Sequence, residues 1–313
     1  MKVEDLFIQW LLGSSIATIR YQTRTQLLGL PVNDPVVQKE YQSIQNNGAV
    51  PAILDRQTAP GQWPYINHFY TPKYVSTHWS LMLLEELKAD PHNERFQAGA
   101  EYMLTATHKD ILSRLSSGNH GWTCLWGNIV RYELYAQRWE DERLQCMLEL
   151  TASSLEKHHC QCEYNSDNPC SWGAARSLWA LAAIPQQHRS ILVKNAIQQG
   201  VDFLLASTNQ YLQQKSIHPG EKTNPLWRKL SFPIFYHADI LFVLRVLAEL
   251  NNLHHPQAQP ALTWLQNLRK PNGQWRGSSP FRQRTWPEMG APEETNRWVS
   301  LQTAAILYQA GML

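Results

Sequence analysis

Two kinds of hydrophobic pattern alternate along the chain. The first kind is apolar around most of its circumference and carries small or polar residues only near its start. Copies of it begin near Thr77, Leu125, Ser171, Tyr236 and Arg297, with a less clear copy from Ser15. The second kind carries its apolar residues on a single stripe at helical spacing. Copies of it cover 34–45, 93–106, 141–156, 188–206 and 256–268. The first pattern is typical of helices enclosed on most sides, and the second is typical of helices half exposed to water.

The alternation predicts an all-α protein in which inner and outer helices form pairs. We expect one domain over residues 1–313, an (α/α)6 barrel or toroid of about six helical hairpins without a β-sheet. A superhelical solenoid of the same hairpins is the structural alternative. Long loops rich in Pro, Gly and aromatic residues precede most of the inner runs. They cover 46–74, 165–171, 211–233 and 272–297. Because loops on a rigid scaffold commonly carry function, we expect the chemistry at their end of the barrel.

Composition narrows the class of partner. The chain has 28 Lys and Arg against 26 Asp and Glu, so the formal charge of +2 gives no reason to expect nucleic acid. Charged residues make up only 17% of the chain, whereas it has 13 Trp, 12 Tyr and 8 Phe. Such a chain either packs many large rings structurally or lines an apolar cavity with them.

The cysteines and the N-terminal segment indicate a compartment. Five cysteines are an odd number in a long chain, and the first 15 residues place acidic groups before a short apolar run. This is a poor secretory signal, so we expect a cytoplasmic protein with free thiols. No stretch approaches the ~18 consecutive apolar residues of a membrane span, although peripheral contact with a membrane stays open.

Two tryptophan motifs carry a family resemblance. Residues 57–63 read QTAPGQW and fit the Q-x₃-G-x-W repeat of squalene-hopene cyclases, and residues 272–275, NGQW, carry the end of that repeat. The sequence therefore resembles the terpenoid cyclase and protein-prenyltransferase α/α toroid superfamily, particularly single-domain bacterial proteins described as prenyltransferase-like or squalene-cyclase-like. The resemblance implies the toroid fold and a hydrophobic, isoprenoid or lipid substrate in its central cavity. The physical interpretation of Trp63 and Trp275 is structural, with each ring packed against a neighbouring hairpin.

The chain departs from that family in its acidic motifs. It contains neither the D-x-D-D acid of triterpene cyclases nor a D-D-x-x-D magnesium motif for a diphosphate. A squalene-type cyclisation is therefore disfavoured, and any chemistry must come from other residues.

A second resemblance concerns zinc. Protein prenyltransferase β subunits hold zinc with an Asp and a Cys before one inner helix and a His at the next, and Asp167, Cys170 and His237 match that order. The chain's own residues point to the same rim, because Cys124, Cys160, Cys162 and Cys170 precede inner runs. Thiolate, imidazole and carboxylate are ligands of tetrahedral zinc. Our metal candidates are Cys162, Cys170 and His237, with Asp167 and Cys124 as further candidates, against ordinary buried thiols as the alternative.

Asp239 and His237 are the catalytic candidates. Asp239 stands about one turn into an apolar run, where it either pairs with an arginine or acts as a general acid with a raised pKa. Tyr70, Lys73 and Tyr74 are expected at the mouth of the cavity. Residues at the starts of inner runs are expected to line it and bind substrate. They are His78, Trp79, Trp126, Asn128, Trp172, Arg176, Tyr236 and Trp298.

Three functions stay open on these observations. The first is an enzyme resembling terpene cyclases or prenyltransferases that acts on an isoprenoid or other hydrophobic substrate. The second is a zinc-dependent enzyme of thiol chemistry, similar in architecture to lanthionine cyclases. The third is a non-catalytic binding protein on the same fold.

Overall fold

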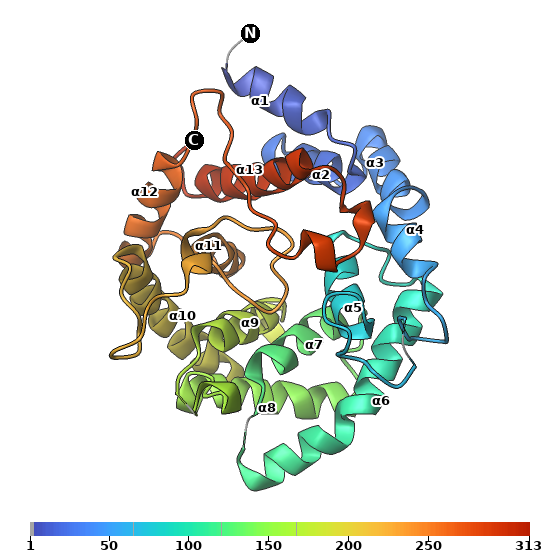
Figure 1. The fold of residues 1–313 in the computed structure, drawn as a ribbon, viewed down its shortest axis with the longest axis vertical. Coiled ribbons are helices and arrows are strands. Elements are labelled where there is room, and N and C mark those ends of the chain that lie inside the picture. The colour runs from blue at the N-terminus through green and yellow to red at the C-terminus, as the bar shows by residue number, and fades with distance from the viewer. Residues whose placement is uncertain (1–2, 65, 120, 167) are drawn as a thin grey trace.

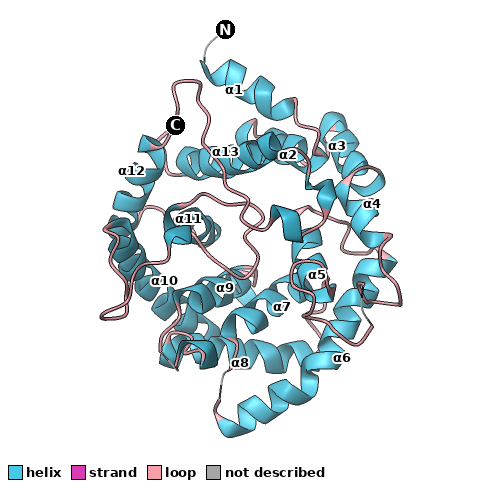
Figure 2. Ribbon diagram, in the orientation of Figure 1, coloured by secondary structure: helices cyan, strands magenta, loops and turns pink. Residues whose placement is uncertain are grey.

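The predicted helical class is confirmed by a computed structural model. It describes residues 3–64, 66–119, 121–166 and 168–313. Helices account for the regular structure of these residues, which contain isolated bridges but no β-strand (Figure 2). No helix in these four ranges is both long and apolar enough to cross a lipid bilayer.

One set of helices follows the apolar runs, and each of its members packs against the next. Helix α5 contacts α7, α7 contacts α9, α9 contacts α11, α11 contacts α13, and α13 contacts α2. These helices are buried on most sides, as their sequences predict. The set consists of α2 (Ala17–Gln22), α5 (Thr77–Glu86), α7 (Thr123–Tyr135), α9 (Ser171–Ala182), α11 (Ile240–Glu249) and α13 (Pro292–Gln309).

The amphipathic runs form a second set that covers the first (Figure 1). Helix α6 contacts α8, α8 contacts α10, and α10 contacts α12, and each also packs against a helix of the first set. The members are α1 (Val3–Leu12), α3 (Pro35–Asn46), α4 (Ala49–Leu54), α6 (Glu94–Ser117), α8 (Glu142–His158), α10 (Ile191–Leu212) and α12 (Gln259–Asn267). A π-helical turn extends α2 over Thr23–Leu27. Short 3₁₀ turns lie at Glu163–Asn165, Gln186–His188, Pro225–Arg228, Pro256–Ala258, Arg282–Arg284 and Pro287–Met289.

Side-chain caps explain where several helices begin. The carboxylates of Asp34 and Asp141 and the amide oxygen of Asn93 accept backbone N–H groups in the first turns of α3, α8 and α6. The Ser190 hydroxyl does the same for α10. Because the first N–H groups of a helix have no partner within it, these polar residues fix the start positions.

Trp63 and Trp275 make matching contacts in different parts of the chain. Both side chains are fully buried. The Trp63 indole donates to the Ile53 carbonyl at 2.7 Å, and the Trp275 indole donates to the Leu265 carbonyl at 2.8 Å. Their backbone N–H groups donate to a hydroxyl on the next inner helix, Thr77 for one and Ser300 for the other. Each tryptophan thus joins the end of an outer helix, through its indole, to an inner helix, through its backbone N–H.

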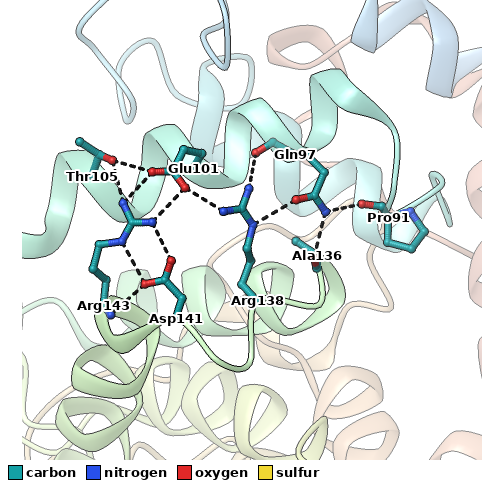
Figure 3. A network of polar contacts seen from close by, with 8 residues as sticks. All are labelled: Pro91, Gln97, Glu101, Thr105, Ala136, Arg138, Asp141 and Arg143. Carbon is teal, nitrogen blue, oxygen red and sulfur yellow. Dashed lines mark hydrogen bonds and ion pairs between the residues drawn. The ribbon is translucent and has the colours of Figure 1, made fainter.

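A polar network joins α6 to the corner between α7 and α8 (Figure 3). Both arginines of that corner donate to the carboxylate of Glu101. Arg138 donates to one oxygen at 2.7 Å, and Arg143 donates to the other at 2.7 Å and to the same oxygen as Arg138 at 2.9 Å. Arg143 also bonds Asp141, and Arg138 bonds the amide oxygen of Gln97. The network is largely at the surface, so it fixes the orientation of the corner more than it stabilises the fold.

The two ends of the chain are bonded to each other. The Ser14 hydroxyl donates to a Glu294 carboxylate oxygen at 2.5 Å, and the Ser15 backbone N–H donates to the other oxygen at 3.1 Å. Arg297 donates to that same carboxylate and to the Trp10 carbonyl. Helix α13 therefore lies beside α1 and α2, as Figure 1 also shows.

Candidate functional site

A pocket of about 870 Å³ opens between the loops that precede α5, α7, α9 and α11. Aromatic side chains make up a large part of its lining, to which the starts of α7 and α9 also contribute. The aromatic lining consists of Phe69, Tyr70, Trp122, Tyr164, Trp172, Tyr211, Trp227 and Tyr236. The other side chains at the wall include Lys73, Cys124, Leu125, Cys162, Asn165, Cys170, Ser171, His218, Glu221, Lys222 and Asn224. A volume of this size suits a small-molecule ligand.

Several of these rings are held in place by hydrogen bonds and stacking. Tyr211 stacks on Trp227 with ring centroids 4.2 Å apart, and its hydroxyl donates to Ser171 at 2.8 Å. The Trp172 indole donates to the Ala238 carbonyl at 3.1 Å. Because these rings are held from behind, they present a preformed apolar surface to a ligand.

Lys73 is the cation at the mouth of the pocket. Its ammonium lies 5.6 Å from the ring centroid of Tyr70 and 5.2 Å from that of Tyr236. Loss of hydration raises the pKa of both tyrosines, so each is a neutral phenol at neutral pH. Lys73 therefore places a positive charge beside neutral aromatic faces, and Lys222 adds a second cation to the lining.

Three predicted thiols come together at the pocket wall. Cys124 stands at the start of α7, Cys162 in the loop after α8, and Cys170 at the N-cap of α9. Loss of hydration raises the pKa of Cys124 to about 12. A hydrogen bond with Cys170 lowers the pKa of Cys162 to about 7, and the same bond raises the pKa of Cys170 well above its ordinary value. Cys162 therefore carries the most thiolate character of the three.

His237 does not join these thiols at the pocket wall. Its ring lies among aromatic side chains, 4.4 Å from Trp172, 3.9 Å from Tyr236 and 5.0 Å from Phe281 between centroids. Burial lowers its pKa to about 4, with a further contribution from the Arg176 charge, so the imidazole is neutral. Its Nδ1 has no hydrogen-bond partner among the described residues.

The predicted zinc ligands do not form a metal cage in the described part of the chain. No three His, Cys, Asp or Glu side chains there are placed to hold one ion. Cys162, Cys170 and Cys124 share the pocket, whereas His237 faces the aromatic cluster, and Asp167 lies outside the described residues. Tetrahedral zinc needs four donors, or three and a water, so the donor set does not fit it as arranged.

Asp239 is the N-cap of α11 and does not stand one turn inside the helix. One carboxylate oxygen accepts the Phe242 N–H at 2.8 Å, and the other accepts the Ser231 N–H at 2.9 Å. Burial raises its pKa to about 7, partly opposed by those two hydrogen bonds. Asp239 has no ion pair with Arg176, Arg131 or Arg297 within the four described ranges. It is not part of the pocket wall.

Replacing Asp239 with alanine should lower the free energy of unfolding by about 1–2 kcal/mol, the usual cost of a lost N-cap. Asp239→Asn should keep the bond to the Phe242 N–H but lose the bond to the Ser231 N–H, so it should cost less than Asp239→Ala without being neutral. Urea unfolding followed by circular dichroism measures both. Equal losses in the two variants would contradict a capping role.

The other predicted binding residues divide between the pocket and the interior. Trp172 and Tyr236 line the pocket. The Trp79 indole donates to the Tyr70 carbonyl from behind the wall, whereas Trp126 and Trp298 are buried elsewhere, Trp298 stacked on Phe232. None of these last three tryptophans forms part of the pocket lining.

His78, Asn128 and Arg176 are buried polar side chains of the inner helices α5, α7 and α9. His78 Nδ1 lies 3.3 Å from the Tyr132 hydroxyl, and burial lowers the pKa of His78 to about 3. The Asn128 amide has no hydrogen-bond partner among the described residues. Arg176 donates to the His237 carbonyl and lies 3.8 Å from the ring centroid of Phe242, and burial lowers its pKa to about 9. His78 thus contacts α7 and Arg176 contacts the segment before α11, and none of the three residues lines the pocket.

An aromatic cluster closes the space next to the pocket. Tyr74 lies 4.5 Å from Phe281 and 4.8 Å from Phe235 between ring centroids. The Trp286 indole donates to the Ser80 hydroxyl on α5 at 3.1 Å. Tyr74 therefore belongs to this cluster, and only Tyr70 and Lys73 of the three predicted mouth residues line the pocket.

Sequence reasoning missed about two thirds of the wall. Trp122, Tyr211, Trp227, His218 and Lys222 line the pocket but lie in loops or at an outer helix end. The long segment between α10 and α11 contains three of them, His218, Lys222 and Trp227, and its richness in polar and aromatic residues could have indicated a role at the site. A loop's sequence does not say which of its side chains turn inward.

Comparison with known proteins returned no match. No family model, no curated protein and no solved structure matches this chain.

Proposed function

We propose that the helices form an α/α toroid. The succession of inner helices, each packed on the next, supports this architecture. So does the contact at its closing point, where the Thr18 hydroxyl of α2 donates at 2.7 Å to the carbonyl of Leu87, the residue that follows α5. A solenoid would leave the first and last inner helices apart, whereas α2 and α13 are in contact.

We propose that the protein binds a hydrophobic small molecule, isoprenoid-like or otherwise lipid-like, in the aromatic pocket. The observation that carries this proposal is the pocket itself, about 870 Å³ walled by preformed aromatic rings. Burying an apolar chain against such a surface contributes about 25 cal/mol per Å² removed from water. The few polar groups at the wall, Lys73 and the thiols among them, are suited to orient one end of the ligand.

Binding accounts for the geometry better than acid-initiated cyclisation does. Both Asp239 oxygens accept backbone N–H groups, and the side chain lies away from the wall. A terpene-cyclase-like or prenyltransferase-like activity would therefore depend on other groups, of which the pocket offers thiols, phenols and Lys73. Turnover of a hydrophobic substrate would require one of these groups to act on the bound molecule, whereas binding requires only the pocket.

Trp172 provides the direct test of binding. Its half-buried ring forms part of the wall, so Trp172→Ala should weaken binding of a fluorescent fatty-acid or polyprenol probe by about tenfold, the equivalent of about 1.4 kcal/mol. Fluorescence titration at constant protein concentration gives the dissociation constant. The matched control is Trp264→Ala, because Trp264 is also half buried but lies on α12 away from the pocket.

The same protein preparation can identify a natural ligand that co-purifies with the protein. Mass spectrometry of organic extracts from purified protein should find a hydrophobic molecule in the wild type and less of it in Trp172→Ala. Equal affinity for the probe in wild type, Trp172→Ala and Trp264→Ala would remove the pocket as the binding site.

A zinc-dependent thiol chemistry is the second candidate: Cys124, Cys162 and Cys170 line one pocket, but they are not arranged as a zinc site among the described residues, so zinc would have to draw them closer. Elemental analysis of protein purified without chelator decides it. Zinc at one equivalent in the wild type that is lost in Cys162→Ser would favour this function over simple binding. Zinc absent from the wild type would remove it.

A further inference from the structure

A second pocket, small and polar, lies at the opposite end of the inner helices from the aromatic pocket. The segments before α5 and α11 line the aromatic pocket, whereas Glu85 and Glu249, at the ends of these two helices, line the second one. Helices α2 and α13, which contact each other, contribute Gln22 and Gln302 to it. This polar recess has a volume of about 230 Å³ and shares no described residue with the aromatic pocket.

Two glutamine side chains of the polar recess are buried without a partner. Gln22 and Gln302 are each 8% exposed, and neither side-chain amide has a hydrogen bond within the described ranges. Each amide carries two N–H donors and an oxygen acceptor. Because buried polar groups in folded proteins are nearly always bonded, the partners of these two amides come from outside the chain.

A buried carboxylate oxygen of the polar recess is also open. Glu85 is 2% exposed, and its Oε1 accepts the Arg131 Nε–H at 3.3 Å. Its Oε2 is buried and has no hydrogen-bond partner among the described residues. The recess therefore offers one strong acceptor without a donor beside two amides that can both donate and accept.

The charged side chains of the polar recess already have partners of opposite sign. These pairs are Arg131 with Glu85 and Glu249, Arg245 with Glu86, and Lys88 with Glu85. A cationic ligand would meet the guanidinium and ammonium groups, and an anionic ligand would meet the carboxylates. The balance of charge therefore favours a ligand that is polar and neutral.

The apolar part of the recess is small. Ala248, Ala305 and Ile306 supply its aliphatic side chains, and no aromatic ring lines it in the described part of the chain. Its volume is below the about 300–1,000 Å³ of sites for drug-sized ligands. A ligand of the recess is therefore small and is recognised through hydrogen bonds.

We propose that the polar recess binds a small neutral polyol, such as a monosaccharide, whose hydroxyl groups bond Gln22, Gln302 and Glu85 Oε2. A hydroxyl both donates and accepts, so it satisfies the two amides and the carboxylate oxygen alike. Without a stacking surface the affinity is modest, with a dissociation constant on the order of 1–10 mM. The proposal does not depend on the ligand of the aromatic pocket, because the two pockets are separate.

The test uses the full chain and three sugars of one ring size. Saturation-transfer NMR compares D-glucose with D-glucuronate and with protonated D-glucosamine, which differ mainly in charge. We expect saturation transfer to glucose and weaker binding of both charged sugars. No transfer to glucose, or tighter binding of either charged sugar, would overturn the proposal.

Variants of the two amides locate the binding. Gln22→Leu and Gln302→Leu should each weaken glucose binding about tenfold, because each removes a buried hydrogen-bonding group that only the ligand satisfies. The matched control is Gln199→Leu, because Gln199 is exposed on α10 outside the recess. Equal affinity for glucose in the wild type and in all three variants would exclude the recess as the binding site.

Thermal unfolding separates binding from a role in the fold. An unpaired buried amide costs stability and a leucine of similar size does not, so the melting temperatures of Gln22→Leu and Gln302→Leu should equal or exceed that of the wild type. Lower melting temperatures with unchanged glucose affinity would show that the amides serve the fold alone. Gln302→Asn keeps a buried amide but shortens it, so it should weaken glucose binding even if the leucine variant fails to fold.

Discussion

Trp63→Ala is expected to lower the free energy of unfolding by about 3–5 kcal/mol, the usual cost of removing a fully buried aromatic ring. The ring is inaccessible to solvent, and its indole bonds the end of α4 while its backbone bonds α5. The substitution leaves a large cavity and removes the indole bond to the Ile53 carbonyl, which keeps the Arg56 N–H as a donor. Urea unfolding followed by circular dichroism gives the change.

Two further variants assign that loss to its causes. Trp63→Phe fills most of the cavity but removes the indole N–H. It should therefore lower the free energy of unfolding by about 1–2 kcal/mol, less than Trp63→Ala does. Trp264→Ala removes a half-buried tryptophan from α12 and should cost clearly less than Trp63→Ala. A loss for Trp63→Ala no larger than that for Trp264→Ala would show that the ring does not join the two helices.

Glu133→Gln is expected to stabilise the protein above neutral pH. Glu133 is a fully buried carboxyl on α7, and neither of its oxygens has a hydrogen-bond partner among the described residues. Burial raises its pKa well above the ordinary value of 4.5, although Arg138 and Arg143 oppose the shift. The folded protein therefore holds a proton here that the unfolded chain releases.

The sign of the pH dependence follows from that proton. Below about pH 4.5 the group is protonated in both states, and its contribution to stability is fully present. As the pH rises toward the folded pKa, that contribution is lost by about 1.4 kcal/mol per pH unit. Glutamine carries no proton to lose, so the variant and the wild type should be alike near pH 4.5, and the stability advantage of the variant should grow progressively as the pH rises above that value.

Glu101 provides a control of opposite sign. Hydrogen bonds from Arg143 lead the causes that lower its pKa (Figure 3). Its contribution is present above its unfolded pKa and is lost as the pH falls, so Glu101→Gln should destabilise the protein at neutral pH. The side chain is 46% exposed, so the effect should stay below about 1 kcal/mol. A stability gap for Glu133→Gln that does not grow with pH would contradict a buried neutral carboxyl.

The helices could be predicted from the sequence because burial leaves a periodic pattern. The runs from Thr77, Ser171 and Tyr236 correspond to buried helices, although the last begins only at Ile240. That difference has a physical reason, because the Asp239 carboxylate sets the start of α11 by capping it. The sequence shows an acidic residue beside an apolar run but does not say on which side of the boundary it falls.

The site was predicted less completely because side-chain direction depends on loops. Cys124, Cys162 and Cys170 come together because each stands at or just before an inner helix, a position that spacing reveals. His237 occupies a similar position, yet its ring turns into the aromatic cluster around Phe281. That partner comes from the segment before α13, and no local pattern connects the two.

The bond between Ser14 and Glu294 joins residues 280 positions apart, and this separation has a consequence for biosynthesis. Contacts of long sequence separation form late, because the chain entropy of closing the intervening loop must be overcome first. Helices α1 and α2 leave the ribosome long before α13 exists to cover them. Their apolar faces must therefore wait for nearly the whole chain, and this interval is when a nascent molecule is most exposed to aggregation and most dependent on chaperones.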